Sequence, residues 1–376
     1  MKPKRATIQD VAREAGVSKA TVSAAMNNTG TIAAATRNRV LEVAARLNYR
    51  PAAVKRNQGA APKPTIGMLI REINNPYHVE VAAGASRWLE KNGYGFVVTA
   101  SGGHYDTERI RVEMLCEREL DGIIINPVLH EGADLSYLYE LRRRNFPFVL
   151  LSGIYGVRAS LVDVDNVQAS WRAVSYLIRH GHTRIVHLAG PSFAMHSQER
   201  IEGVRRAFSE SHLVFRNDII VRAGHHLEDG YRAGKELFTK RPRAEWPTAV
   251  TCYNDLVALG LYRALSELGL SVPEDVSIIG YGDLPVLEYL PVPLTTVHVP
   301  KLKMGETAAR LLVRLIESDL AEAPERVNLE TELVVRKSTR SLLPPEAEEE
   351  PKQELGPADE PAAAAPRRVR ARKRSA

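Results

Sequence analysis

Short apolar segments alternate with amphipathic helical segments over most of this 376-residue chain. The apolar segments are rich in β-branched residues and have the length of buried parallel strands. They are residues 65–70, 94–99, 121–125, 146–151, 184–188, 218–221, 249–252 and 276–280. Such alternation predicts parallel sheets covered by helices. Because about 280 residues is too long for a single sheet, we expect an α/β body of two similar lobes.

The N-terminal segment follows a different pattern. Thr7–Asp10 matches the capping-box sequence that begins a helix, Gly16 is suited to end that helix, and Ser18 to cap the next one, over about 19–27. Apolar residues at helical spacing are expected to form a small core. They are Ile8, Val11, Ala12, Ala15, Val22, Met26, Val40, Leu41, Val43, Ala44 and Leu47. Two short helices, a tight turn between them and a third helix predict a helix-turn-helix head.

Charge is distributed unevenly along the chain. Its 51 Lys and Arg residues exceed its 45 Asp and Glu residues, which gives a net charge of +6. Residues 1–64 carry 12 basic and 3 acidic residues, residues 65–343 have a net charge of −3, and the charges of residues 344–376 cancel. A small basic head on a nearly neutral body favours nucleic acid as a partner over a merely solvated basic face.

Composition excludes other classes of protein. Two cysteines cannot form a disulfide framework, which favours a reducing compartment. No apolar run reaches the ~18 residues of a membrane span, and no signal peptide is visible at the N-terminus. We therefore expect a cytoplasmic protein with no membrane partner.

Two motifs in the head point to a known family. The stretch Thr7–Ser23 (TIQDVAREAGVSKATVS) and the stretch Leu47–Pro51 (LNYRP) resemble the head and the hinge entry of the lactose/galactose repressor family of bacterial transcription regulators. The resemblance continues to about Thr339 and implies a periplasmic-binding-protein-like core whose lobes close around a small ligand. The implied organisation is a helix-turn-helix domain over 1–50, a hinge over 51–64, a two-lobed domain over 65–343 and a disordered tail over 344–376. We expect chain crossovers near Val164, Leu294 and Ala323, which assign 65–163 and 295–323 to the N-lobe, and 164–294 and 324–343 to the C-lobe.

The resemblance implies that the second helix of the head lies in the DNA major groove. Lys19 and Ala20 then match the two positions that mainly read bases, where Lys19 donates to guanine or phosphate and Ala20 contacts a thymine methyl. The positions that hold the phosphate backbone are matched by Thr7, Ser18, Thr21, Ser23 and Asn27. Local helix capping is the alternative role for these polar side chains.

The hinge departs from the family pattern. Similar proteins insert a hinge-helix leucine between base pairs in the minor groove, and Gln58 stands at that position here, with Arg56 close by. Glutamine does not wedge as leucine does, so we expect a weakly formed hinge helix and less DNA bending. The alternative is a shifted alignment in which Val54 or another residue supplies the wedge.

Ligands of open α/β sheets bind beyond the carboxyl ends of the strands. The residues that match the family's effector positions are Tyr77, His78, His196, Arg200, His225, Asn254 and Asp283. Arg200 matches an arginine that clamps ligand oxygens through its planar fork, with a structural ion pair as the alternative. We expect Asn254 to bind the ligand and Asp255 to cap a helix. No compact set of metal ligands is visible, so we expect neither a metal nor a cofactor.

A second departure concerns the end of the last predicted strand. Many family members carry an aspartate where Gly282 stands here, and Asp283 follows one position later. The pocket is therefore expected to be less negative than usual, which favours an anionic or phosphorylated ligand over a neutral sugar. A degenerate pocket that holds no effector is the alternative.

The C-terminal tail is rich in Pro, Ala and Glu and ends in a basic run. It lacks the apolar content needed to fold and has no heptads. Its basic end either adds non-specific DNA affinity or is neutralised by the acidic stretch within the tail.

Sequence motifs typical of nucleotide-binding, metalloprotease or serine-hydrolase enzymes are absent, so we expect no enzyme. We predict a ligand-responsive, sequence-specific transcription regulator, most plausibly a repressor, which binds a pseudo-palindromic double-stranded DNA operator as a homodimer. It would sense a small sugar-like or nucleoside-like metabolite between its lobes. The rival predictions are a ligand-independent regulator and a sugar-binding receptor.

Overall fold

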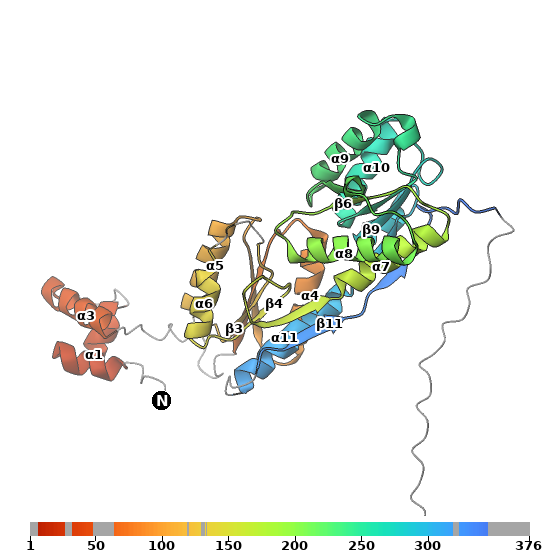
Figure 1. Ribbon diagram of the computed structural model, residues 1–376. Helices are drawn as coiled ribbons and strands as arrows, with labels where there is room; N and C mark the ends of the chain where they lie inside the picture. Colours follow the sequence, from red (N-terminus) through yellow and green to blue (C-terminus); the bar gives the residue numbers. More distant parts are fainter. Residues whose placement is uncertain are drawn as a thin grey trace, which may run out of the picture. The chain divides into compact units, whose positions relative to one another are not determined.

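The computed structural model describes residues 7–26, 32–47, 64–118, 120–128, 132, 134–318 and 323–344 (Figure 1). The chain divides into an N-terminal head, residues 1–63, and a C-terminal body, residues 64–376. Each is described separately below.

The head contains the three predicted helices, α1 (Ile8–Ala15), α2 (Lys19–Met26) and α3 (Ala34–Arg46). The capping box is confirmed, because the Thr7 side chain accepts from the Asp10 amide and the Asp10 side chain accepts from the Thr7 amide. Gly16 ends α1 with a φ of 62°, in the left-handed region. The expected core is also present around the fully buried Val11, Val22 and Val40. Leu41 was wrongly expected in that core, since it is 43% exposed.

The N-lobe of the body is built on a parallel six-stranded sheet with the order β11-β5-β4-β3-β1-β2. Its strands are β1 (Thr65–Ile70), β2 (Gly95–Ala100), β3 (Gly122–Ile125), β4 (Phe148–Leu150), β5 (Ser160–Val164) and β11 (Arg326–Leu329). Its helices are α4 (Pro76–Lys91), α5 (Tyr105–Glu117), α6 (Ser136–Arg143) and α11 (Lys301–Glu317). Figure 1 shows α5 and α6 on one face of this sheet and α4 and α11 on the other.

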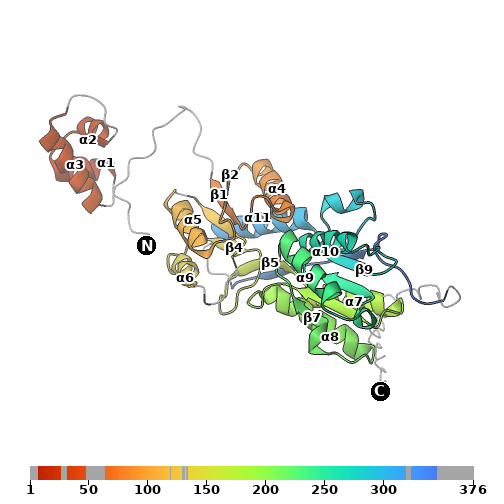
Figure 2. The same ribbon diagram turned by 90° about the horizontal axis from the view of Figure 1, so that it is seen from above.

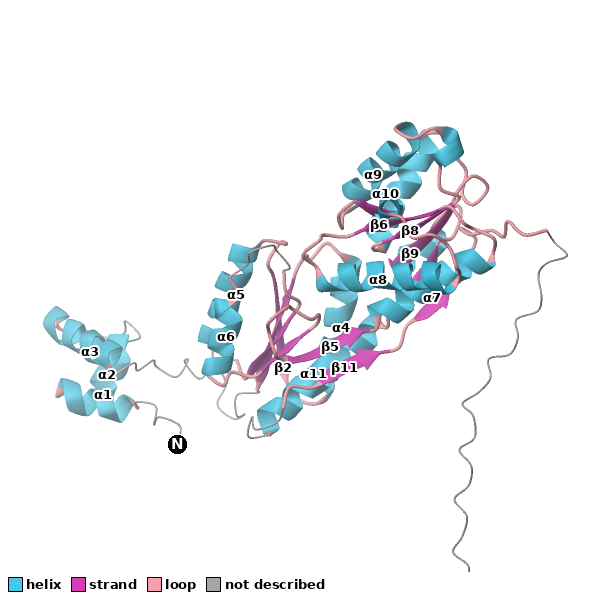
Figure 3. Cartoon of the chain, viewed as in Figure 1, coloured by secondary structure: helices cyan, strands magenta, loops and turns pink. Residues whose placement is uncertain are grey.

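The C-lobe has a second six-stranded sheet with the order β12-β10-β9-β8-β6-β7. Its strands are β6 (Ile185–Ala189), β7 (Ile220–Arg222), β8 (Ala249–Cys252), β9 (Ser277–Gly282), β10 (Thr295–His298) and β12 (Glu332–Val334). Only β12, which pairs with β10, runs antiparallel. Around the sheet lie α7 (Asn166–Arg179), α8 (Met195–Glu210), α9 (Leu227–Thr239) and α10 (Asp255–Glu267), as Figures 2 and 3 show. Short 3-10 helices also belong to the lobe, at Asn217–Ile219, Arg243–Glu245 and Pro285–Tyr289.

The predicted two-lobed α/β body is therefore confirmed, with two corrections to the crossovers. The first crossover follows Val164 as expected, because β5 belongs to the N-lobe and α7 packs in the C-lobe. The second lies after β10 and not near Leu294, since β10 pairs in register with β9 of the C-lobe. The third lies after β11 and not near Ala323, since β11 pairs with β5 of the N-lobe. The lobes thus comprise 65–164 with 301–329, and 166–298 with 332–343.

Glycines let the long helices of each lobe approach closely. An added Cβ at Gly305 of α11 would lie 1.9 Å from the carbonyl oxygen of Val81 in α4, and one at Gly84 of α4 would lie 2.0 Å from that of Leu302. Backbone therefore contacts backbone, with no flexible side chain between the helices. This contact fixes α4, whose first turn carries Tyr77 and His78.

Candidate functional site

A cleft lies between the two lobes, where the carboxyl ends of both sheets meet. The N-lobe contributes Arg71 after β1 and Asn126 after β3, and the C-lobe contributes residues after β6, β7 and β8. This is where an open α/β sheet is expected to bind a ligand.

Six of the seven predicted effector residues line this cleft: Tyr77, His78, His196, Arg200, His225 and Asn254. Asp283 was a wrong expectation, because it lies outside the wall of the cleft. Its φ of 56° turns the chain, and its carboxylate pairs with Arg336 at 2.8 Å and with His298 at 2.8 Å. An aspartate with two cationic or hydrogen-bonding partners has little capacity left for a ligand.

The carboxyl group of Asp255 explains why a glycine and not an aspartate stands at residue 282. A Cβ on Gly282 would lie 3.1 Å from Asp255 Oδ2, so an aspartate there would bring two carboxylates together. The buried Asp255 accepts hydrogen bonds from Thr296 Oγ1 at 2.6 Å and from the Leu284 amide at 2.9 Å. Its pKa is raised to about 6 by burial.

The helix-capping role expected of Asp255 belongs to Asn254. Asn254 is the N-cap of α10, because its Oδ1 accepts from the Val257 amide at 2.8 Å. Its Nδ2 donates to the carbonyl oxygen of His225 at 2.9 Å, which ties the loop after β7 to α10. Asp255 links α10 to β10 and to the loop after β9 instead of capping the helix.

Arg200 is buried among neutral groups. Its Nε donates to Asn166 Oδ1 at 3.1 Å, and one terminal nitrogen donates to the carbonyl oxygen of Tyr253. The guanidinium carbon lies 3.5 Å from the centroid of the Tyr281 ring. In the described part of the chain no carboxylate forms an ion pair with Arg200, so the structural ion pair that we considered as an alternative is not formed. A buried guanidinium is costly unless hydrogen-bond acceptors surround it, which favours a ligand that offers acceptor atoms to Arg200.

Several polar atoms in the cleft lack a hydrogen-bond partner among the residues that the structure describes. They are Asn126 Oδ1, Ser152 Oγ and His196 Nδ1, each buried in the wall of the cleft. Neighbouring atoms are engaged, since Asn126 Nδ2 lies 2.9 Å from His78 Nδ1 and His196 Nε2 contacts the Tyr253 hydroxyl. Buried polar atoms are usually satisfied, so these three mark positions where a bound molecule finds partners.

The charge of the cleft is mixed. Burial lowers the pKa of both His78 and His196, so both imidazoles are neutral at pH 7. The lining includes the cations Arg71 and Arg200 as well as the carboxyl groups of Glu72, Asp163 and Asp255. Burial raises the pKa of Asp163 to about 6. The absence of a carboxylate at residue 282 is therefore compensated elsewhere in the wall.

Several lining residues were not predicted from the sequence, namely Arg71, Glu72, Asn126, Ser152, Asp163, Tyr253 and Tyr281. Most of them stand at or directly after the carboxyl end of a strand. That position was the one signal in the sequence that could have identified them.

The second helix of the head exposes the predicted base-reading residues. Lys19, Ala20 and Ser23 are exposed on or near the start of α2. The alternative capping role holds for Ser18, whose Oγ accepts from the Thr21 amide at 3.1 Å, and for Thr7 at the start of α1. Asn27, Arg56 and Gln58, as well as the tail after residue 344, lie outside the described residues.

A buried carboxyl group next to the cleft gives a prediction about pH. Glu108 of α5 accepts from the Tyr137 hydroxyl and from the amide of Val128, and burial raises its pKa to about 7 from 4.5. The unfolded chain loses this proton near pH 4.5, whereas the folded chain keeps it up to about pH 7. Glu108 thus contributes stability below pH 4.5 that is lost as the pH rises through 7, of the order of 3 kcal/mol.

We expect Glu108→Gln to remove this part of the pH dependence in urea unfolding at pH 4.5 and pH 7. Glu113→Gln, at an exposed site of the same helix, is the control and should keep the wild-type dependence of the free energy of unfolding on pH. If the free energy of unfolding changed equally with pH in wild type and Glu108→Gln, the raised pKa of Glu108 would be contradicted.

Comparisons with known proteins agree with both parts of the structure. A family model described as bacterial regulatory proteins, lacI family, matches residues 7–52, and one described as a periplasmic binding protein-like domain matches residues 174–339. The HTH-type transcriptional repressor PurR of Vibrio vulnificus is 35% identical over 344 residues, which covers 90% of this chain and 99% of the relative.

Two solved structures are similar over nearly the whole chain. The transcriptional regulator CelR in complex with cellobiose has a TM-score of 0.66 and 30% identity, covering 89% of this chain and all of that one. The lac repressor dimer bound to operator and the anti-inducer ONPF has a TM-score of 0.67 and 26% identity, covering 90% and 100%.

A helix-turn-helix head joined to a two-lobed α/β body with a polar cleft defines a transcription regulator with a DNA-binding and an effector-binding domain. The chain belongs to the LacI family of bacterial regulatory proteins, and its relatives are transcriptional repressors, not enzymes. No helix within the described ranges is long and apolar enough to cross a membrane.

Proposed function

We propose that this protein represses transcription as a cytoplasmic homodimer on a pseudo-palindromic operator, under the control of a small effector in the cleft. The observation that carries the effector is the set of buried polar atoms in the wall of the cleft that have no hydrogen-bond partner among the described residues. A degenerate pocket would have closed these atoms off or replaced them with apolar side chains.

The chemistry of the wall favours a neutral, planar, nitrogen-containing ring as the effector, such as a purine base. Aromatic side chains of Tyr77, Phe193, Tyr253 and Tyr281 line the cleft and offer faces and edges to a flat ring. Asn126 Oδ1 accepts and Arg200 donates, which complements the mixed donors and acceptors of such a ring. Because the charge of the cleft is mixed, it does not favour the anionic ligand that the sequence led us to expect. The name PurR of the related repressors is consistent with a purine base.

The proposed dimer rests on how much DNA one recognition helix can contact. A single α2 reaches only a half-site, so a specific operator needs two heads and two-fold symmetry. The related lac repressor is a dimer on its operator. The effector then acts by binding one arrangement of the lobes more tightly than another.

A gel shift tests this proposal, with full-length protein and the DNA upstream of its own gene as the probe. Parallel arms contain hypoxanthine, guanine, ribose, cellobiose or glucose 6-phosphate. We expect a purine base to change the DNA affinity at least about tenfold and the sugars to leave it unchanged. A response to a sugar or to the phosphate alone would overturn the proposed effector, and no response in any arm, with DNA still bound, would favour the ligand-independent regulator.

The exposed lysine of the second helix gives a prediction for the same assay. Lys19→Ala should weaken DNA binding by about 1–3 kcal/mol, since it removes a donor to base or phosphate. Lys240→Ala, at a lysine that is 70% exposed on the body, is the matched control and should leave binding unchanged. Equal affinities of the two variants would exclude Lys19 from the DNA interface.

A further inference from the structure

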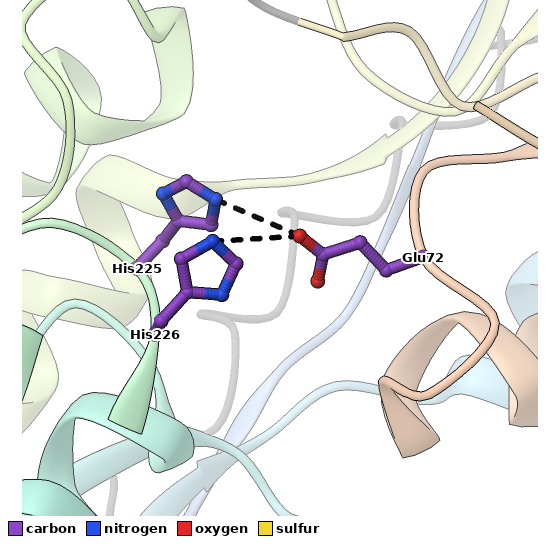
Figure 4. Close-up of side chains that lie close together, drawn as sticks. All are labelled: Glu72, His225 and His226. Atoms are coloured by element: carbon purple, nitrogen blue, oxygen red, sulfur yellow. Dashed lines mark ion pairs between the residues drawn. The ribbon is translucent and has the colours of Figure 1, made fainter. Parts of the chain in front are cut away.

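Three side chains from opposite lobes converge at one wall of the cleft. Glu72 follows β1 of the N-lobe, and His225 and His226 precede α9 of the C-lobe (Figure 4). Glu72 Oε1 lies 3.5 Å from Nε2 of His226 and 3.9 Å from Nε2 of His225. Both imidazoles point toward the same carboxylate oxygen, and their ring centroids are 3.9 Å apart.

These separations are too long for strong hydrogen bonds, which join nitrogen and oxygen at about 2.7–3.2 Å. They are close to the distance that separates two ligand atoms bound to the same metal ion. Two ligands that each lie about 2.0–2.1 Å from a tetrahedral metal are about 3.3 Å apart. A small inward movement of three side chains would bring all three ligand atoms to that spacing, because they already lie within 4.8 Å of one another.

Charge argues against a simple double ion pair. Two imidazolium rings whose centroids lie 3.9 Å apart would repel each other. Neutral imidazole is the form that binds a metal. Arg71 is the cation nearby that opposes metal binding, while Glu72 supplies a negative charge at the site.

The two histidines are held at the backbone. The amides of His225 and His226 both donate to Asp229 Oδ2 at 3.0 Å, and the carbonyl of His225 accepts from Asn254. Their side chains remain about half exposed, at 41% and 49%, whereas that of Glu72 is 14% exposed. A fixed backbone with accessible ring nitrogens is suited to capture an ion from solution.

We propose that Glu72, His225 and His226 form a binding site for a divalent transition metal, represented by Zn²⁺, that links the two lobes. Two imidazole nitrogens and one carboxylate oxygen suit zinc or iron and not Mg²⁺ or Ca²⁺, which prefer oxygen ligands. Three protein ligands leave a coordination position for water or for a donor atom of a molecule in the cleft. Because the ligands come from both lobes, the metal favours the closed cleft.

Metal binding itself does not depend on the proposed function, whereas its effect on regulation does. The experiment therefore uses untagged, full-length protein stripped with a chelator, with no DNA present. Zn²⁺ is titrated in competition with a chromophoric chelator, and Co²⁺ reports the ligand set through its visible absorption. The variants are Glu72→Gln and His226→Ala, and their controls are Glu236→Gln and His212→Asn.

The controls match in chemistry and lie away from the cluster. Glu236 is exposed toward the C-terminal end of α9, and His212 is exposed beyond the far end of α8 at a φ of 54°, which asparagine tolerates. We expect the wild-type protein to bind one Zn²⁺ per chain. Both variants should bind Zn²⁺ at least about tenfold more weakly and give a changed Co²⁺ spectrum, whereas both controls should bind as the wild type does. Absence of a saturable site, or equal binding by variants and controls, would overturn the metal site. The gel shift repeated in chelator tests repression separately, so the two failures are distinguishable.

Discussion

Replacing Arg200 by alanine is expected to lower the affinity for the effector by at least about 100-fold. The guanidinium is buried between the Tyr281 and Tyr253 rings, and among the described residues it has no carboxylate partner. Two charge-assisted hydrogen bonds to a ligand contribute about 1.5–3 kcal/mol each, which corresponds to this loss. Calorimetric titration with the compound that changes the gel shift, hypoxanthine in our expectation, measures the affinity directly.

Two further variants separate binding from folding. Arg200→Lys keeps the charge but loses the planar fork, so it should recover only a small part of the affinity. Arg206→Ala removes an exposed arginine of the same helix that pairs with Glu210, and should bind the effector normally. Gel shifts without effector should be unchanged in all three variants, because α8 is not part of the DNA-binding head. Wild-type effector affinity in Arg200→Ala would exclude Arg200 from the site.

The strands that the sequence predicted share one property. Segments such as Thr65–Ile70 are buried on both faces of a parallel sheet, so they are continuous apolar runs that can be read directly. The edge strand β11 has the sequence RVNL and exposed positions, and β10 reads TTVH, so neither has such a run. Their pairing with β5 and β9 decides the lobe boundaries, and pairing depends on residues far away in sequence.

The cleft was predictable where a residue matches a position of the family pattern. Tyr77 in α4 and Arg200 in α8 were found in this way, by resemblance to the family. Asp283 was assigned wrongly because its partner Arg336 is distant in the sequence, and the ion pair between them appears only in the folded chain. Asn126 and Asp163 gave no residue-type signal, since a polar residue after a strand is ordinary in any loop.

Replacing Gly305 by alanine is expected to destabilise the body by about 3 kcal/mol. Alanine gains about 1 kcal/mol over glycine in helix propensity, so a surface site would be stabilised. Here the new methyl group would lie 1.9 Å from the carbonyl oxygen of Val81 and 2.7 Å from the amide nitrogen of Ala85. Backbone atoms cannot rotate away as a side chain can, so α4 and α11 must separate, and this overpacking exceeds the gain in propensity.

Gly93→Ala is the control for this variant, because it separates backbone strain from steric clash. Gly93 follows α4 with a φ of 82°, and no heavy atom lies within 4 Å of an added Cβ, so we expect a cost of about 1 kcal/mol from the left-handed conformation alone. Urea unfolding at pH 7 compares the two variants. Since α4 carries Tyr77 and His78, Gly305→Ala should also weaken effector binding, whereas Gly93→Ala should not. If Gly305→Ala is as stable as wild type, the close contact between α4 and α11 does not exist as described.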